Sequence, residues 1–104
     1  YFTRTVGKDG DHIDVFVGKY LDFDTIYVVD QVNGSGEFDE SKVMLGFKDE
    51  ASAKEAYMGA YSKGWKGFKK ITGVSVDFFK EWLYDNHRQR KPFYDYVDVK
   101  QNKI

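Results

Sequence analysis

Cysteine is absent from this chain of 104 residues, so a disulfide scaffold and a thiolate zinc site are both excluded. His12 and His87 are the only histidines, which argues against a histidine-rich transition-metal site. No apolar run approaches the ~20 residues that would span a bilayer, and no signal peptide is visible. These absences predict a cytoplasmic protein with no membrane partner.

A strong net charge is also absent, because lysine and arginine nearly balance aspartate and glutamate and leave a net charge of −1. No overall field therefore favours nucleic acid or an acidic membrane. Acidic residues nevertheless crowd the first half of the chain, whereas basic residues gather later. The run Arg88-Gln89-Arg90-Lys91 is best interpreted as a solvated linker, and the less favoured alternative is a patch that contacts nucleic-acid phosphates.

The chain does contain enough apolar material for one modest core, with 41% hydrophobic and 18% aromatic residues. We therefore expect one domain over residues 1–85, followed by a basic polar tail over residues 86–104. The chain opens at Tyr1 without a methionine. We therefore expect a piece of a longer protein, with covalent neighbour domains.

Alternating, β-rich segments predict the strands, which lie at residues 12–18, 24–32, 41–47 and 67–72. The second and third of these form an antiparallel hairpin with a long acidic tip around the turn cluster at residues 33–36. The moderate alternation of residues 93–99 predicts an edge strand in the tail. Together with the helices below, these strands indicate an α+β fold.

Two helices are predicted between and after these strands. The first runs from about residue 49 to residue 61, with Asp49 as its N-cap. Its apolar stripe at i, i+3, i+4 and i+7 consists of Ala53, Ala56, Tyr57 and Ala60. The second helix begins at Ser75, which is a good N-cap. The buried face of the second helix consists of Phe78, Phe79, Trp82 and Leu83.

The strongest chemical signal is the acidic segment Asp9-Gly10-Asp11-His12-Ile13-Asp14, which leads into an apolar strand. Carboxylates this close repel one another, and desolvating them costs free energy unless cations compensate. Hard carboxylate oxygens suit Mg²⁺ or Mn²⁺, with Ca²⁺ as a competitor. From spacing alone, a solvated acidic turn is an equal alternative.

An EF-hand calcium loop is the obvious rival for this segment, and the sequence excludes it. That loop needs glycine at its sixth position and glutamate at its twelfth. Counted from Asp9, these positions hold Asp14 and Tyr20. His12, inside the same segment, is better explained as a strand-edge side chain than as a metal ligand or a proton relay.

The acidic segment also carries a family resemblance. Asp9-Gly10-Asp11-His12-Ile13-Asp14-Val15 is similar to the signature D-G-D-P-x-D-V of the soluble, Mg²⁺-dependent inorganic pyrophosphatases, with His12 in place of proline. Two later segments are weakly similar to the family, namely Asp30 followed by Glu40-Ser41-Lys42, and Tyr61-Ser62-Lys63-Gly64-Trp65. Over most of residues 4–83, the pattern most resembles the pyrophosphatase-like domain of the polyvalent proteins of phages and conjugative elements.

The resemblance implies a small, curved antiparallel β-sheet or partial barrel with two packed α-helices. It also implies an active site that holds Mg²⁺, or Mn²⁺, together with pyrophosphate or a related phosphoanhydride. By motif match, the metal ligands would be Asp9, Asp14, Asp30 and Glu40.

The resemblance also implies roles in catalysis and substrate binding. Asp11 would orient or deprotonate the attacking water, and Lys42 would hold phosphate oxygens and offset charge on the leaving group. Further phosphate contacts would come from Tyr61, from Lys63, and from Arg4 and Lys8 in place of residues that the family has upstream.

Several of these assignments have an alternative. Asp39 could replace Glu40 as the ligand, although Glu40 has the family's spacing to the lysine that follows. Lysines such as Lys63 more often belong to a solvated face, and Tyr61 and Trp65 more often belong to a core. For the domain as a whole, the alternative is a non-catalytic module of a larger protein, which binds metal and phosphate or contacts a protein or DNA partner.

Overall fold

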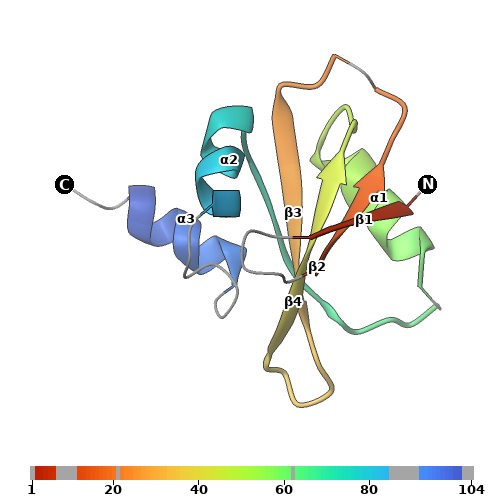
Figure 1. The fold of residues 1–104 in the computed structure, drawn as a ribbon. Helices are drawn as coiled ribbons and strands as arrows, with labels where there is room; N and C mark the ends of the chain where they lie inside the picture. Colours follow the sequence, from red (N-terminus) through yellow and green to blue (C-terminus); the bar gives the residue numbers. More distant parts are fainter. Residues whose placement is uncertain (1, 7–11, 21, 62, 85–91, 102–104) are drawn as a thin grey trace.

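The structure is a computed structural model, and it describes residues 2–6, 12–20, 22–61, 63–84 and 92–101. The elements, in chain order, are β1 (Phe2–Val6), β2 (His12–Val17), β3 (Thr25–Val32), β4 (Phe38–Leu45), α1 (Glu50–Gly59), β5 (Phe68–Ser75), α2 (Val76–Tyr84) and α3 (Phe93–Gln101). Figure 1 shows them as one open sheet flanked by helices. The predicted small α+β fold is therefore confirmed.

The sheet has the strand order β1-β2-β4-β3-β5 and is mixed rather than purely antiparallel. Strands β3 and β4 form the predicted antiparallel hairpin, and β5 pairs antiparallel with the other side of β3. The exception is the parallel pair of β2 and β4. It arises because the chain reverses direction twice between these strands, and the second reversal inserts β4 between β2 and β3.

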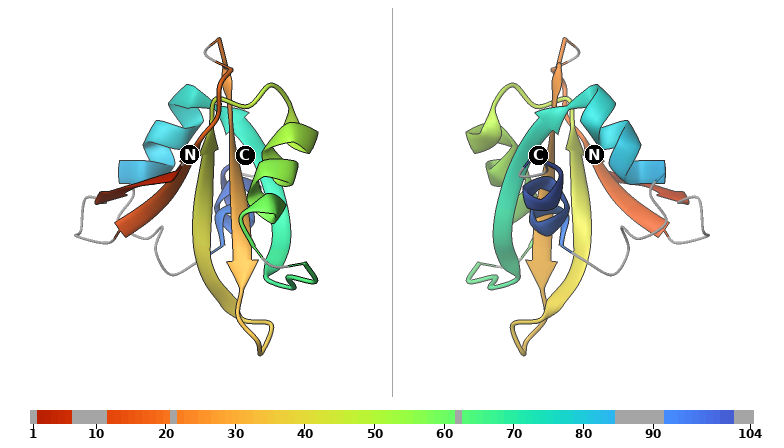
Figure 2. Two further views of the ribbon diagram at one scale, coloured as in Figure 1. Left: turned by 90° about the vertical axis from the view of Figure 1, so that its right-hand side faces the viewer. Right: turned by 90° about the vertical axis from the view of Figure 1, so that its left-hand side faces the viewer.

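Each face of the sheet has its own hydrophobic core. Helix α1 covers one face, where Tyr57 packs with Val29 and other buried residues. Helices α2 and α3 cover the opposite face, where Trp82 packs with Val28. Figures 1 and 2 show α1 on one side of the sheet and the other two helices on the opposite side. Neighbouring residues of β3 enter different cores because side chains alternate between faces along a strand.

The first two helices begin where the sequence predicts. Asp49 caps α1, since its Oδ1 accepts a hydrogen bond from the Ser52 backbone N–H at 2.8 Å and a capping box is complete. Ser75 caps α2, because its Oγ accepts from the Phe78 backbone N–H at 3.1 Å. Within the described residues, no helix is long and apolar enough to cross a membrane.

The predicted edge strand at residues 93–99 is wrong, because this segment forms helix α3. The helix begins after Pro92, whose carbonyl accepts hydrogen bonds from the Asp95 and Tyr96 backbone N–H groups. Phe93 and Val97, four residues apart, are both buried in the core that α2 and α3 share with the sheet. The weak local alternation was therefore overridden by packing, and the helix belongs to the same core as the strands.

Candidate functional site

A lysine between two carboxylates lies on the face of the sheet that α1 covers. Lys42 is the register partner of Asp14 in β2 and of Val29 in β3, so these side chains share one face. The Lys42 Nζ donates to the Asp14 Oδ2 at 2.5 Å and also forms an ion pair with the Glu40 Oε1. We refer to Asp14, Glu40 and Lys42 as the lysine–carboxylate cluster.

The charge of Lys42 is secured by its two partners. Its side chain is only 9% exposed, and burial alone would lower the pKa of the ammonium. The hydrogen bonds to Asp14 and Glu40 outweigh this burial, so the pKa of Lys42 lies above its ordinary value. Lys42 is therefore a cation at neutral pH, and the cluster sets one positive charge against two carboxylates.

Beside this cluster, an amide and three aromatic side chains form a hydrogen-bonded network. The Gln31 Oε1 accepts from the hydroxyls of Tyr57 at 2.8 Å and Tyr61 at 3.1 Å. The Trp65 Nε1 donates to the Tyr57 hydroxyl at 2.8 Å, and its indole stacks on the Tyr61 ring at a centroid distance of 4.3 Å. The Gln31 Nε2 donates to the Asp39 Oδ2 at 3.1 Å. This network fixes the position of Tyr61 next to Lys42.

The two tyrosine hydroxyls of the network remain protonated at neutral pH. Burial raises the pKa of Tyr57 to about 12, although the Trp65 hydrogen bond opposes the rise. Burial also raises the pKa of Tyr61, against the lowering effect of the nearby Lys42 charge. A protonated phenol has one O–H donor, and Tyr61 gives it to Gln31, so Tyr61 could donate to an anion at this face only by exchanging that bond.

The structure does not bring Asp30 together with the other predicted metal ligands. Asp30 pairs in register with Ser41, so it faces α2 and α3, whereas Lys42 faces α1. The fully buried Asp30 carboxylate accepts from the Ser41 hydroxyl at 2.8 Å and from the backbone N–H groups of Phe93 at 2.7 Å and Tyr94 at 3.0 Å. Asp30 therefore caps α3, which corrects the expectation that it completes the cation site.

The carboxylate of Asp30 is held in a poorly solvated position. Desolvation raises its pKa above the ordinary value, while the hydrogen bonds from Phe93, Ser41 and Tyr94 partly offset that rise. The residue that instead shares the face of Lys42 is Gln31, the register partner of Glu40.

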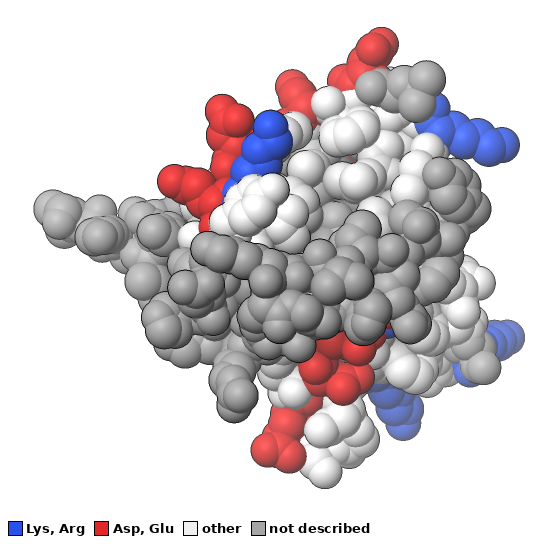
Figure 3. Space-filling view, viewed as in Figure 1, with Lys and Arg blue, Asp and Glu red and all other residues white. Residues whose placement is uncertain are grey.

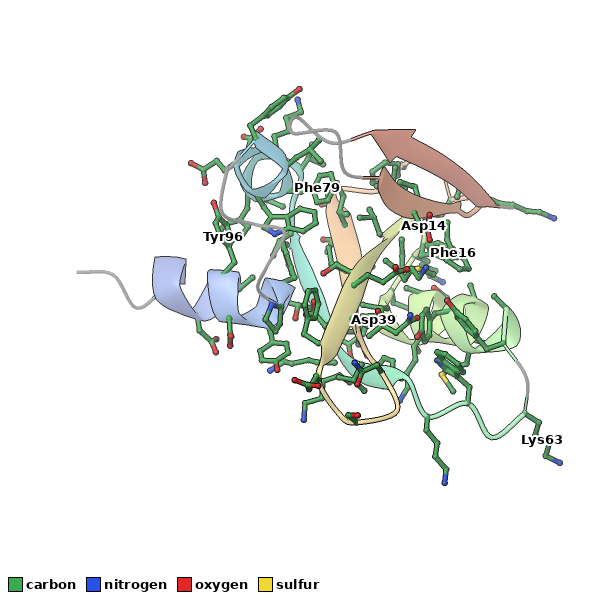
Figure 4. The ribbon with its side chains drawn as sticks, turned by 60° about the horizontal axis from the view of Figure 1, so that its bottom comes forward. Asp14, Phe16, Asp39, Lys63, Phe79 and Tyr96 are labelled. Carbon is green, nitrogen blue, oxygen red and sulfur yellow. The ribbon has the colours of Figure 1, made fainter. Side chains whose placement is uncertain are left out.

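The remaining predicted site residues are placed only in part. Lys63 is exposed, and Figure 4 shows it extending away from the sheet and from Asp14. The backbone of Arg4 lies in β1 as the register partner of Asp14. Lys8, Asp9 and Asp11 lie outside the described residues. The structure thus brings together Asp14, Glu40, Lys42 and Tyr61, and it leaves Lys63 outside the group.

Several contributors to this face were missed in the sequence. Gln31 and Tyr57 tie the network together, yet Gln31 carries no motif and Tyr57 was assigned only to the apolar stripe of α1. The signal that could have found Gln31 is strand alternation, since it lies two residues after Val29 in β3. Asp39, the alternative ligand, is engaged with Gln31 rather than with Lys42.

The described acidic side chains of this face are few for the predicted cation site. In the part of the chain that the structure describes, no group of three or more acidic or histidine side chains could hold a metal ion. Asp14 and Glu40 do converge on one point, and their carboxylate oxygens are the hard ligands that Mg²⁺ prefers. Figure 3 shows further acidic side chains at the lower end of the molecule, where the hairpin of β3 and β4 lies in Figure 1. The donor type fits Mg²⁺, with two ligands in place.

One of three comparisons with known proteins gave a match. Searches among curated proteins and among solved structures gave no match. The sequence profile of the family described as Inorganic Pyrophosphatase matches residues 1–84, a stretch that contains β1 to β5, α1, α2 and the lysine–carboxylate cluster. The resemblance is therefore confirmed at the level of the family. The chain belongs to the inorganic pyrophosphatase family.

Proposed function

We propose that this chain is a metal-dependent hydrolase domain that cleaves pyrophosphate or a related phosphoanhydride. We further propose that it acts in the cytoplasm as one part of a phage or mobile-element protein. The observation that supports the activity best is the lysine–carboxylate cluster, because it lies within the stretch that matches the family. A cation-binding pair of carboxylates next to a lysine and a tyrosine hydroxyl suits a substrate with several phosphate oxygens.

The cation would be Mg²⁺, with Mn²⁺ as a substitute. Its ligands would be Asp14 and Glu40, joined by Asp9, which lies three positions before the start of β2 in the sequence. When bound, the cation would neutralise phosphate charge and lower the pKa of a water molecule. Asp30 is left out of this ligand set because its carboxylate already accepts hydrogen bonds on the opposite face.

Side chains of this chain would bind the phosphate oxygens and accept the proton of the attacking water. Lys42 would pair with a phosphate oxygen and offset the charge that builds on the leaving phosphate. Tyr61 would exchange its hydrogen bond to Gln31 for one to a second phosphate oxygen. Asp11 would accept the proton of the attacking water. Arg4, whose backbone is opposite Asp14 in register, and Lys8 would contact further phosphate oxygens.

The test is phosphate release from pyrophosphate with and without Mg²⁺. We expect release that requires the cation and that Asp11→Asn abolishes, while Mg²⁺ binding changes little. Asp22→Asn is the matched control, because Asp22 is exposed in the connection between β2 and β3. If Asp11→Asn weakened Mg²⁺ binding as much as turnover, Asp11 would be a ligand and the role assigned to it would be wrong.

A second candidate function is a non-catalytic module that binds a cation and a phosphorylated ligand. Two observations favour it, namely that both cluster carboxylates are paired with Lys42 and that Asp30 is committed to α3. Such a module could also contact a protein or, through its basic tail, DNA. Mg²⁺ binding without phosphate release, on this chain and on one extended upstream, would favour the module over the enzyme.

A further inference from the structure

The ammonium of Lys42 is engaged by protein groups on several sides. It pairs with the Asp14 Oδ2 and the Glu40 Oε1, and its charge acts on the neighbouring Tyr61 phenol. An ammonium has three N–H donors, so little capacity remains for a phosphate oxygen. An anion that approached Lys42 would also meet the two carboxylates and be repelled by them.

The same two carboxylates are suited to a divalent cation. Asp14 lies on β2 and Glu40 on β4, and both direct an oxygen toward the point that the Lys42 Nζ occupies. A doubly charged cation with a preference for carboxylate oxygens would compete for that point with a singly charged ammonium. Glu40 is 46% exposed on its side chain, so the cluster can be reached from solvent.

Displacement would leave Lys42 close to the bound cation. Its four-carbon stem is flexible, and its compact ammonium can bind phosphate as a point charge. Tyr61, which the hydrogen bond to Gln31 holds beside Lys42, would face the same anion. Cation binding would therefore offset the charge of the two carboxylates near the anion and also free a lysine for it.

We infer that Lys42 couples the two ligands of this site: it occupies the place of the divalent cation between Asp14 and Glu40, and cation binding releases it to bind phosphate. The inference rests on the proposed cation and phosphate site but does not require turnover. Because coupling between two ligands is reciprocal, Mg²⁺ and phosphate tighten each other's binding by the same factor.

The first experiment uses the unmodified chain. Inorganic phosphate is titrated by calorimetry with and without saturating Mg²⁺, and the lysine Cε and Nζ signals are followed by NMR during a Mg²⁺ titration. We expect Mg²⁺ to tighten phosphate binding about tenfold, within the usual range for coupled sites. We also expect the Lys42 signals to shift, while those of the exposed Lys48 do not.

The second experiment compares Lys42→Met with Lys48→Met, which has the same change of charge at an exposed position. Lys42→Met should bind Mg²⁺ about tenfold more tightly, because the competing ammonium is gone, and its phosphate binding should respond to Mg²⁺ less than that of the unmodified chain. Should Lys42→Met fail to fold, the NMR titration of the unmodified chain decides.

The outcomes separate this inference from the proposed function. Unmoved Lys42 signals while Mg²⁺ binds, or Lys42→Met affinity no tighter than that of Lys48→Met, would overturn the coupling. No Mg²⁺ binding to the unmodified chain would overturn the proposed cation site and the coupling with it. Mg²⁺-dependent phosphate binding without phosphate release would support the coupling and overturn only the enzyme.

Discussion

At the scale of single residues, the face that α1 covers depends on polar side chains that are buried yet satisfied. Gln31 is 6% exposed, and its amide oxygen accepts from two tyrosine hydroxyls while its amide nitrogen donates to Asp39. Such a network costs little because each buried polar group has a partner, and removing one member leaves others unpaired. Tyr57 connects this amide to Trp65, since its hydroxyl donates to Gln31 and accepts from the Trp65 Nε1.

Tyr57→Phe should lower stability and change its dependence on pH. The pKa of Tyr57 is raised to about 12 in the folded chain, above the ordinary phenol value of 10.0, so folding favours the neutral phenol. The stabilisation that folding gains from the neutral phenol is complete below pH 10 and is lost as the pH rises toward 12. At neutral pH the variant should therefore lose ~1 kcal/mol of unfolding free energy, because its hydrogen bonds are missing. Above pH 10, the unfolding free energy of the variant should fall less steeply with pH than that of the unmodified chain.

The measurement is urea denaturation at intervals between pH 7 and pH 11.5. Tyr84→Phe is the control, because the Tyr84 side chain is 63% exposed and should leave both the stability and its slope unchanged. Parallel curves for Tyr57→Phe and the unmodified chain above pH 10 would contradict the burial of this phenol.

At the scale of elements, the placement of α3 depends on one residue of β3. Asp30 accepts the first free backbone N–H groups of the helix, although it lies 63 positions before Phe93 in the chain. Such groups at a helix start need acceptors, and here the acceptor comes from the sheet rather than from the preceding residue. Phe93 then packs against Trp82 at a centroid distance of 5.0 Å, which joins α3 to α2.

Asp30→Ala should destabilise the chain by about 1–3 kcal/mol, because it leaves buried N–H groups of α3 without an acceptor. Chemical denaturation would measure the loss. Hydrogen exchange at the Phe93 and Tyr94 amides should accelerate more than exchange in β4. Asp98→Ala, at an exposed position of the same helix, should change stability by less than ~0.5 kcal/mol. Equal effects of the two changes would refute the capping role.

The junction after β2 and β4 depends on two glycines. The Gly18 backbone N–H donates to the Leu45 carbonyl at 2.7 Å, and a Cβ added to Gly18 would overlap the Gly46 carbonyl oxygen. Gly46 itself has a φ of 79°, a region that favours glycine. The ends of the parallel strands can therefore approach this closely only without side chains.

Gly18→Ala should cost about 1–3 kcal/mol, because backbone rather than a flexible side chain blocks the added methyl group. Gly34→Ala provides the comparison, since nothing lies within 4 Å of an added Cβ there and its φ is not positive. Thermal denaturation of the two variants would measure the difference. A Gly18→Ala variant as stable as Gly34→Ala would show that the junction can open without cost.

At the scale of the whole molecule, the sheet separates two tasks. On one face, an apolar core and the Asp30 cap join β3 to α2 and α3. The other face, which α1 covers, holds the lysine–carboxylate cluster. Figure 4 shows this separation, with Asp14 and Phe16 toward α1 and with Phe79 and Tyr96 on the opposite side. The site face therefore depends on β2, β3, β4 and α1, all within the family match.

Mg²⁺ should raise the melting temperature of the whole chain. Binding to the folded state alone stabilises by RT ln(1 + [L]/Kd), or ~1.4 kcal/mol at ten times Kd, which corresponds to about 6–11 °C for a domain of this size. Scanning calorimetry at millimolar Mg²⁺ measures the shift. NaCl of equal ionic strength should produce a smaller one, and Asp14→Asn should reduce the Mg²⁺ effect. An identical shift in NaCl would remove the basis for a specific cation site.

The sequence by itself determined the local features of this protein. Strand alternation located β2, β3 and β5, and two N-caps located α1 and α2, because these signals act over a few residues. The acidic signature was enough to predict the family that the profile confirms. The strand predicted at residues 41–47 included Lys42 but not Glu40, which the structure adds to the same strand.

Only the tertiary structure decided which of these residues meet. Strand register put Asp14 opposite Lys42 and turned Asp30 toward α3, although both aspartates match the family pattern. Packing made residues 93–101 a helix despite their strand-like alternation. Register and packing depend on groups distant in the chain, such as Asp30 and Phe93, so no local pattern encodes them.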